Sequence, residues 1–237
     1  MKNNLSVSLF VPVYNEEKII EGNIMKIEEK LKSITDNYEL TIVDDTSKDK
    51  TAEICKKIAK KKIKYIRFDN GPSRRENLAV AMKKAKKEII VYIDSDLATN
   101  LRHLEDLIKK IEHNDIVIGS RYSGIKAKRE FSRKIMSILY NHFLKFYLGS
   151  KINDHQCGFK AFRKHVLLDL IKESGYDKDF VRGWFWDAEI LIRAQKKRYN
   201  ILEIPVEWKY GDKTSFSLKR ELKVIPYILK IKQRLKS

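Results

Sequence analysis

The stretch Ile89-Ile90-Val91-Tyr92-Ile93-Asp94-Ser95-Asp96-Leu97-Ala98-Thr99 decides the fold class of this 237-residue chain. Its apolar, mostly β-branched beginning is typical of a strand buried in a parallel sheet. Asp94 and Asp96 follow directly, so we expect both carboxylates at the carboxyl end of the strand, where open α/β sheets bind ligands. A Mg²⁺ or Mn²⁺ ion that bridges them to a diphosphate would neutralise their charge. A turn that caps the next helix is the alternative.

Apolar runs and amphipathic segments alternate around this stretch. Strands are predicted at Val7–Pro12, Leu40–Asp45, Lys64–Phe68, Ile89–Asp94 and Asp115–Gly119. Helices are predicted at Glu16–Lys32, Lys50–Lys60, Arg75–Lys86 and Leu101–Ile111. Such alternation builds an α/β fold with a doubly wound, mostly parallel sheet. The sequence contains neither a Gly-x-Gly-x-x-Gly nor a Walker A motif, which argues against a dinucleotide oxidoreductase and a P-loop NTPase.

The composition, with 43% hydrophobic and 35% charged residues, favours one large α/β domain. The two cysteines, Cys55 and Cys157, are far apart, which supports neither a disulfide framework nor a zinc site and favours a reducing compartment. No signal-peptide pattern and no spanning apolar stretch is seen. We therefore expect a protein that is soluble or bound at a membrane surface.

The net charge of +18 implies an anionic partner, which could be nucleic acid, acidic lipid or a phosphorylated substrate. Lysines spaced along helices are ordinarily solvated. Residues 213–237 differ, because basic residues alternate there with apolar residues at helical spacing. This pattern predicts a basic amphipathic segment.

Three polar clusters follow successive predicted strands, at Pro12-Val13-Tyr14-Asn15-Glu16-Glu17, Val43-Asp44-Asp45-Thr46-Ser47-Lys48-Asp49-Lys50-Thr51 and Asp94-Ser95-Asp96. They are expected to converge at one edge of the sheet. With these motifs in this order, the chain resembles the family 2 glycosyltransferases, nucleotide-sugar-dependent enzymes of the GT-A fold. The resemblance extends over nearly the whole chain.

Later motifs make the resemblance closest to the dolichyl-phosphate glucosyltransferase branch of the polyprenyl-phosphate hexosyltransferases. They are Ser95-Asp96-Leu97-Ala98-Thr99, Gly119-Ser120-Arg121-Tyr122, Asp154-His155-Gln156-Cys157-Gly158-Phe159-Lys160, Trp186-Asp187-Ala188-Glu189 and Glu203-Ile204-Pro205-Val206-Glu207-Trp208. The neighbouring dolichyl-phosphate mannosyltransferases usually carry glutamine where this chain has Ala98. Two departures stand out: Thr46 replaces a common glycine, and Arg74-Arg75-Glu76-Asn77 occupies a loop that is usually Gly-Lys-Gly-like.

The resemblance implies roles for the clusters. Asp94 and Asp96 would be catalytic residues that hold Mg²⁺ or Mn²⁺, which stabilises the departing nucleoside diphosphate. The donor would be bound by Pro12, Tyr14, Asn15, Glu16, Asp44, Asp45 and Asp94. For the Asp44-Asp45 cluster, a strand-to-helix turn with capping acids is the alternative. The motif around Asp187 and Glu189 is placed near the site without a fixed role.

A polyprenyl phosphate acceptor needs positioning more than a general base, because a phosphate monoester with a pKa of about 6 is already anionic at neutral pH. Cations would hold this phosphate. Arg121 is the catalytic candidate, and the acceptor-binding candidates are Arg121, Arg133, Ser137, Lys209 and Lys213. Ordinary surface charge is the alternative for the arginines.

Residues 129–149 predict an amphipathic helix with a polar stripe formed by Arg133, Ser137, Asn141 and Lys145. With the resemblance, we expect it to lie in a membrane interface, and a buried core or dimer helix is the alternative. The chain then divides into a catalytic domain over residues 1–212, which includes this helix, and the basic segment 213–237. That segment would adhere to anionic lipid at the cytoplasmic membrane face, at about 1 kcal/mol per basic residue.

Together these features predict an inverting transfer of a hexose, first of all glucose from UDP-glucose, to dolichyl or polyprenyl phosphate. Mannose from GDP-mannose, or another sugar, is the alternative within the class. A basic nucleic-acid-binding module is an alternative from another class, but strand-end acids would repel phosphate unless a metal intervened. We therefore expect no nucleic-acid partner. A purely structural membrane-surface protein would have no use for convergent carboxylates.

Overall fold

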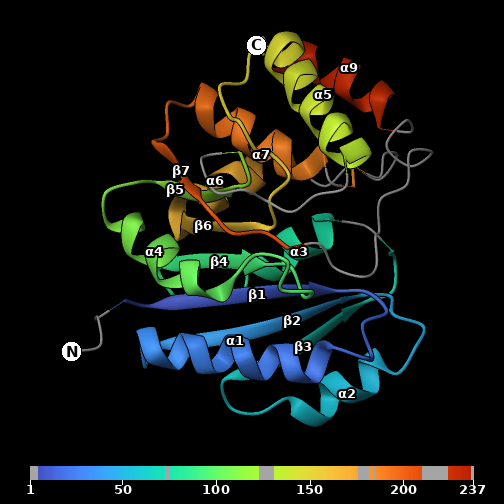
Figure 1. Cartoon of the computed structure of the whole chain (residues 1–237), viewed down its shortest axis with the longest axis vertical. Coiled ribbons are helices and arrows are strands. Elements are labelled where there is room, and N and C mark those ends of the chain that lie inside the picture. Colours follow the sequence, from blue (N-terminus) through green and yellow to red (C-terminus); the bar gives the residue numbers. More distant parts are fainter. Residues whose placement is uncertain are drawn as a thin grey trace.

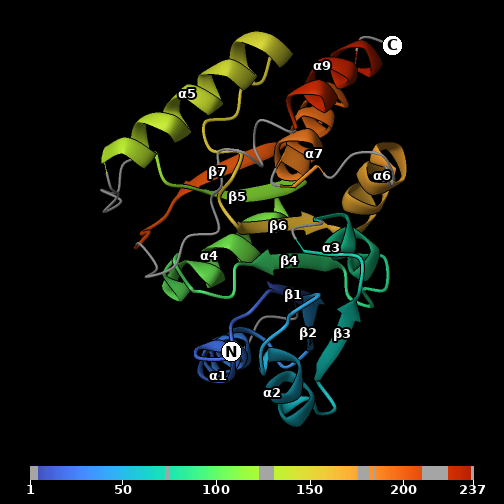
Figure 2. The same ribbon diagram turned by 90° about the vertical axis from the view of Figure 1, so that its right-hand side faces the viewer.

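The computed structural model describes residues 5–72, 75–122, 131–175, 182–183, 185–209 and 224–235. A seven-stranded sheet, in the order β3-β2-β1-β4-β6-β5-β7, forms its centre (Figure 2). The strands are β1 (Val7–Val13), β2 (Tyr38–Asp45), β3 (Ile63–Phe68), β4 (Ile89–Ile93), β5 (Ile116–Ser120), β6 (Phe159–Arg163) and β7 (Ile201–Pro205). The five strands predicted from the sequence are confirmed.

The sheet is mixed, because β6 runs antiparallel between β4 and β5 while the other neighbouring strands are parallel. The sequence pattern did not predict β6. Lys160 interrupts its apolar run and is nevertheless buried, so the strand lacks the continuous apolar signal of its neighbours. The expectation of a mostly parallel sheet still holds.

Helices cover both faces of the sheet, as a doubly wound fold requires. Their bounds are α1 (Ile20–Ile34), α2 (Thr51–Ile58), α3 (Arg75–Met82), α4 (Leu104–Lys109), α5 (Phe131–Leu148), α6 (Lys164–Ser174), α7 (Phe185–Lys196) and α9 (Ile225–Arg234). One apolar core joins the sheet to α1 and α4, and a second joins its other face to α3, α6 and α7. Helix α1 begins later than predicted, because the Glu16 backbone N–H donates to Thr51 Oγ1 (2.8 Å) in a loop ahead of the helix.

A third apolar cluster joins α5, α7 and α9. Helices α5 and α9 lie side by side at the end of the molecule opposite α2 and β3 (Figure 1). The helices expected within 129–149 and 213–237 are thus present in their described parts. None of the helices in the described ranges is both long enough and apolar enough to cross a bilayer.

Candidate functional site

The loops after β1 and β2 are hydrogen-bonded to each other. The Asn15 backbone N–H donates to Ser47 Oγ (3.0 Å), and the Lys48 backbone N–H donates to Asn15 Oδ1 (2.7 Å). Pro12 lies within β1, and the Tyr14 side chain beyond it is 37% exposed. The structure therefore brings the first two predicted donor-binding clusters together.

Asp44 is fully buried at the end of β2. Its carboxylate accepts hydrogen bonds from the Ser47 backbone N–H (2.8 Å), the Tyr65 hydroxyl (2.6 Å) and Arg67 Nη1 (3.0 Å). These bonds hold the turn, as the capping alternative supposed. Contact of Asp44 with a donor remains a prediction.

Thr46 keeps a glycine-like backbone, with φ of 69°. Its hydroxyl donates to the Phe68 carbonyl (2.9 Å) and accepts from the Gly71 N–H (2.8 Å), which ties the loops after β2 and β3 together. A Cβ at Gly71 would lie only 2.5 Å from Asp45 Oδ1, and Asn77 Nδ2 donates to that same oxygen (2.6 Å). The chain therefore encloses Asp45 closely at the same edge.

Asp94 and Asp96 lie in the turn after β4, as predicted. The Asp94 side chain is 42% exposed, and a Cβ at Gly158 would overlap its carboxyl group. Asp96 lies at the surface and accepts a hydrogen bond from the Ala98 backbone N–H (3.0 Å). Partial desolvation by the surrounding chain, together with the negative charge of Asp94, raises the pKa of Asp96.

This pair of carboxylates fits a divalent cation. Both reach the surface, and the negative charge of Asp94 raises the pKa of Asp96, an effect that a bound hard cation would oppose. Within the ranges that the structure covers, no three His, Cys, Asp or Glu side chains cluster as a complete metal site. Water and a bound diphosphate could supply the other oxygens around a cation held by this pair, which is how Mg²⁺ is commonly bound.

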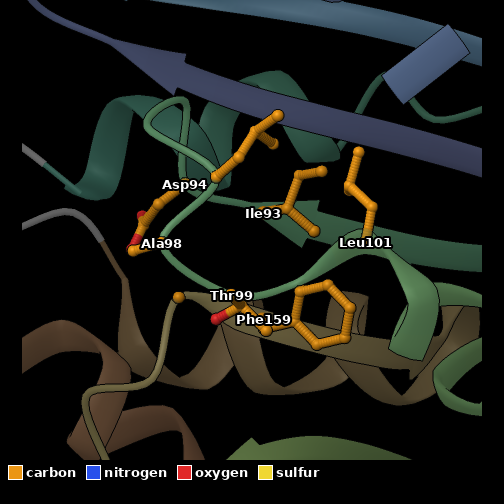
Figure 3. A pocket seen from close by; sticks show the side chains of 8 residues that line it. Ile93, Asp94, Ala98, Thr99, Leu101 and Phe159 are labelled. Carbon is orange, nitrogen blue, oxygen red and sulfur yellow. The ribbon is translucent and has the colours of Figure 1, made fainter. Parts of the chain in front are cut away.

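A small pocket opens beside this turn (Figure 3). Figure 3 shows Asp94 and Ala98 on one side of it and Leu101 and Phe159 on the other. The pocket has room for about one water molecule rather than for a nucleotide. It is therefore too small to accommodate a nucleotide donor.

A cluster of charges that the sequence did not reveal lies behind Asp94. Arg75 Nη2 donates to Asp94 Oδ1 (3.1 Å), and Arg75 Nε lies 3.4 Å from Asp187 Oδ2. Lys160 Nζ (3.2 Å) and the Tyr92 hydroxyl both donate to Asp187 Oδ1. The sequence signals were partial: Arg75 lay in a loop that departs from the family pattern, Lys160 ended one of the quoted motifs, and the motif of Asp187 was expected near the site without a fixed role.

Burial and neighbouring charges shift the pKa values in this cluster. It raises the pKa of Asp187 to about 6, and the neighbouring Arg75 opposes that shift. Burial also lowers the pKa of Lys160 to about 8. Burial acts to lower the pKa of Arg75 as well, but the carboxylates of Asp187, Asp94 and Asp45 raise it. Arg75 is therefore a permanent cation among acids from the end of β2, the turn after β4 and helix α7.

Arg121 forms a bidentate ion pair with the fully buried carboxylate of Asp154. Its Nε and Nη2 each lie 2.7 Å from an oxygen of Asp154, and its backbone N–H donates to Asp154 Oδ2 (2.9 Å). Its guanidinium also lies 5.6 Å from the centre of the Trp208 ring. The sequence proposed Arg121 as a phosphate ligand but gave no sign of this partner. Its charge is thus already balanced, and its contact with an acceptor remains a prediction.

Two other acceptor candidates lie near this group. Ser137 Oγ on α5 is 2.5 Å from the hydroxyl of Tyr122, the neighbour of Arg121. The Lys209 backbone N–H donates to the Ala98 carbonyl (2.7 Å), so Lys209 lies beside the turn that carries Asp94 and Asp96. The structure therefore places Lys209 and Ser137 on the side of the turn away from the donor loops.

The polar stripe of α5 faces the protein. Asn141 Oδ1 lies 2.6 Å from His155 Nδ1, and Lys145 Nζ donates to the loop that precedes β6 (2.6 Å). The stripe thus contacts the loop that carries Asp154, near Arg121. The side chain of Arg133 and the whole of Lys213 lie outside the described residues.

Comparison with known proteins identifies relatives over most of the chain. A family model, Glycosyl transferase family 2, matches residues 8–171. Glycosyltransferase AglD of Haloferax volcanii is 33% identical over 225 residues, which cover 92% of this chain but only 35% of AglD. A dolichyl-phosphate beta-glucosyltransferase of Trichomonas vaginalis is 32% identical over 240 residues, which cover 95% of this chain and 72% of that protein. The chain thus spans about a third of AglD and most of the second relative.

Solved structures show the same fold. Glucosyl-3-phosphoglycerate synthase from Mycobacterium tuberculosis, in complex with Mn²⁺ and UDP-glucose, superposes with a TM-score of 0.70 at 17% sequence identity. The match covers 97% of this chain and 79% of that chain. The expected GT-A fold is confirmed.

Proposed function

This chain belongs to glycosyl transferase family 2, and on that basis we propose that it transfers glucose from UDP-glucose to dolichyl or a related polyprenyl phosphate. The observation that carries the proposal is the position of Asp94 and Asp96. They reach the surface between the paired loops after β1 and β2 and the group around Arg121 and Lys209. The name of the Trichomonas relative and the UDP-glucose in the mycobacterial structure support this choice of acceptor and donor.

The donor would lie on the side of the β1 and β2 loops, with its diphosphate toward Asp94 and Asp96. These two residues would hold Mg²⁺ or Mn²⁺, which when bound neutralises the charge that develops as the anomeric C–O bond breaks. A single displacement by an acceptor oxygen would form the new C–O bond as the nucleoside diphosphate leaves. Inversion at the anomeric carbon would follow, giving a β-linked lipid phosphosugar from an α-linked donor.

The acceptor phosphate would bind near Lys209 and Arg121. Its oxygen is already anionic at neutral pH, so the protein has to position it rather than remove a proton from it. Asp154 fixes the direction of the Arg121 guanidinium through two hydrogen bonds. Ser137 contacts the hydroxyl of Tyr122, the residue that follows Arg121 in the chain, and would contribute from α5. Arg133 and Lys213 remain predicted contributors.

We propose that the outer face of α5 and α9 contacts the membrane that supplies the acceptor. This apolar face consists of exposed side chains of the two helices that are not part of their shared core. Phe146 is the most exposed of them, at 93%, and the full set is Ile135, Met136, Leu139, Phe143, Phe146, Ile225 and Leu229. The exposed Lys230 adds a positive charge that favours anionic lipid. A peripheral position on the cytoplasmic face is part of this proposal.

Sugar transfer into lipid is the direct test. Radiolabelled UDP-glucose or GDP-mannose is incubated with dolichyl phosphate, Mg²⁺ or Mn²⁺, and the protein, and organic-extractable label is counted. We expect metal-dependent glucolipid from the wild type, loss of it in Asp96→Asn, and retention in Asp106→Asn, which removes an exposed acid on α4. Mannolipid alone would overturn the choice of donor, and no lipid product from either donor would overturn the proposed reaction.

Flotation with phosphatidylglycerol-containing vesicles tests the membrane contact separately. We expect Phe146→Glu to reduce the floating fraction, because it places a charge at the most exposed position of the apolar face. Met25→Glu is the matched control, since Met25 is also exposed (38%) but lies on α1. Equal flotation of Phe146→Glu and the wild type would contradict the proposed contact.

A further inference from the structure

Arg75 holds one of the carboxylates on which the proposed metal site depends. It is the first residue of α3, its side chain is 14% exposed, and its Nη2 lies 3.1 Å from Asp94 Oδ1. A divalent cation bound through that oxygen would be brought close to the guanidinium. Two cations at such short range repel each other strongly unless a further anion lies between them.

Arg75 also forms a second ion pair. Its Nε lies 3.4 Å from Asp187 Oδ2, on α7. Asp187 keeps two other partners on its Oδ1, Lys160 Nζ (3.2 Å) and the Tyr92 hydroxyl. The negative charge of Asp187 therefore stays compensated when Arg75 changes its contact with Asp94.

We propose that Arg75 is a built-in counter-ion of Asp94 in the nucleotide-free protein. When a divalent cation binds Asp94 together with the donor, Arg75 Nη2 leaves Asp94 and binds the donor diphosphate instead. The inference rests on the proposed metal-dependent donor site. A planar guanidinium matches the oxygens of a diphosphate well, and the diphosphate supplies negative charge to both cations at once. Metal and nucleotide therefore bind cooperatively, each strengthening the other by the same factor.

Mn²⁺ titration followed by the electron paramagnetic resonance signal of free Mn²⁺ measures this competition directly. Without nucleotide, we expect Arg75→Gln to bind Mn²⁺ about tenfold more tightly than the wild type, because an ionic hydrogen bond to Asp94 no longer has to be broken. With UDP present, the wild type gains affinity for Mn²⁺ and the variant gains less. Arg75→Met, which also lacks the charge, is expected to behave in the same way and serves if the glutamine variant folds poorly.

Arg163→Gln is the control for loss of one positive charge. Arg163 lies at the end of β6 away from Asp94 and pairs with Asp115 (3.9 Å), so its removal should leave Mn²⁺ affinity unchanged. Mn²⁺ affinity in a folded Arg75 variant that is equal to or weaker than that of the wild type would overturn the inference.

The experiment also separates this inference from the proposed function. A wild type that binds neither Mn²⁺ nor UDP would overturn both. Cooperative binding that is lost in Arg75→Gln would support the inference even if no sugar reached the lipid, and in that case only the proposed acceptor would be wrong.

Discussion

Arg182 and Arg75 both connect α3 with α7, yet their surroundings differ. Arg182 is fully buried, and its Nε donates to Glu76 Oε1 on α3 (2.9 Å) while its Nη1 donates to Glu189 Oε2 on α7 (3.0 Å). The same guanidinium also donates to the carbonyls of Ser174 (3.1 Å) and Gly175 (2.6 Å). All three of its nitrogens thus bind protein groups.

The surroundings of Arg75 are more open. Its guanidinium contacts Asp94, whose side chain is 42% exposed, and Asp187. Glu76 follows Arg75 directly in the sequence, so neighbouring residues of one helix enter two different charge clusters. The difference teaches that a buried cation with many bonds stabilises the fold, whereas a cation beside a half-exposed carboxylate is available for exchange with a ligand.

The largest expected effect is on stability, in Arg182→Gln. Its removal leaves Glu76 buried without its cation and Glu189 with Arg193 (2.9 Å) as its remaining cation, so the free energy of unfolding should fall by about 3–5 kcal/mol. Urea unfolding measures this change in free energy. Arg75→Gln is the comparison and should lose about 1 kcal/mol, because Lys160 still compensates Asp187. Equal losses of unfolding free energy in the two variants would show that Arg182 and Arg75 do not differ in their contribution to stability.

Asp96→Asn should show the reverse pattern, a large loss of activity with little change in stability. We expect lipid-linked glucose formation to fall about 10²-fold, because one of the two proposed metal ligands is lost. The free energy of unfolding should change by no more than about 0.5 kcal/mol, since Asp96 lies at the surface. Activity assays beside urea unfolding check both parts, and a stability loss as large as that of Arg182→Gln would place Asp96 among the residues that hold the fold.

The stability of the protein should depend on pH through His155, whose ring contacts Asn141 on α5. Burial lowers the pKa of His155 to about 3, so between that value and the ordinary pKa of about 6.5 the unfolded chain takes up a proton that the folded chain does not. The free energy of unfolding should therefore fall as pH decreases below about 6.5, by up to about 1.4 kcal/mol per pH unit. Unfolding at several pH values measures this slope.

The matched pair of variants for this slope is His155→Gln and His142→Gln. The first should flatten the slope relative to the wild type, and the second should preserve it, because His142 is exposed on α5. A slope that is the same in wild type and His155→Gln would show that other groups cause it.

The smallest expected effect concerns the position of Asp94. In Gly158→Ala the new Cβ overlaps the Asp94 carboxyl, which must turn away, so Mn²⁺ binding in the presence of UDP should weaken about tenfold. Gly22→Ala is the control, since a Cβ there meets nothing within 4 Å. Unchanged Mn²⁺ affinity in Gly158→Ala would mean that the metal does not use Asp94 in this orientation.

Much of the fold follows from local sequence patterns. Alternating apolar runs and amphipathic stretches predicted five strands and the helices between them, because a strand or helix repeats its buried face at short, regular intervals. Strand β6 was missed because Lys160 breaks its apolar run, and only its burial near Asp187 explains that charge. The three strand-end clusters were found for the same local reason, since polar residues after a buried strand mark a loop.

The sequence by itself determined the α/β class, the order of most elements and the acids at the strand ends. Only the tertiary structure decided which charges meet: Arg121 with Asp154, 33 positions away, and Arg75 with both Asp94 and Asp187. Local patterns depend on residues a few positions apart, whereas an ion pair depends on the distance between atoms after the chain has packed. The balance of charge at the site, and therefore which cations are available to a ligand, is set by that packing.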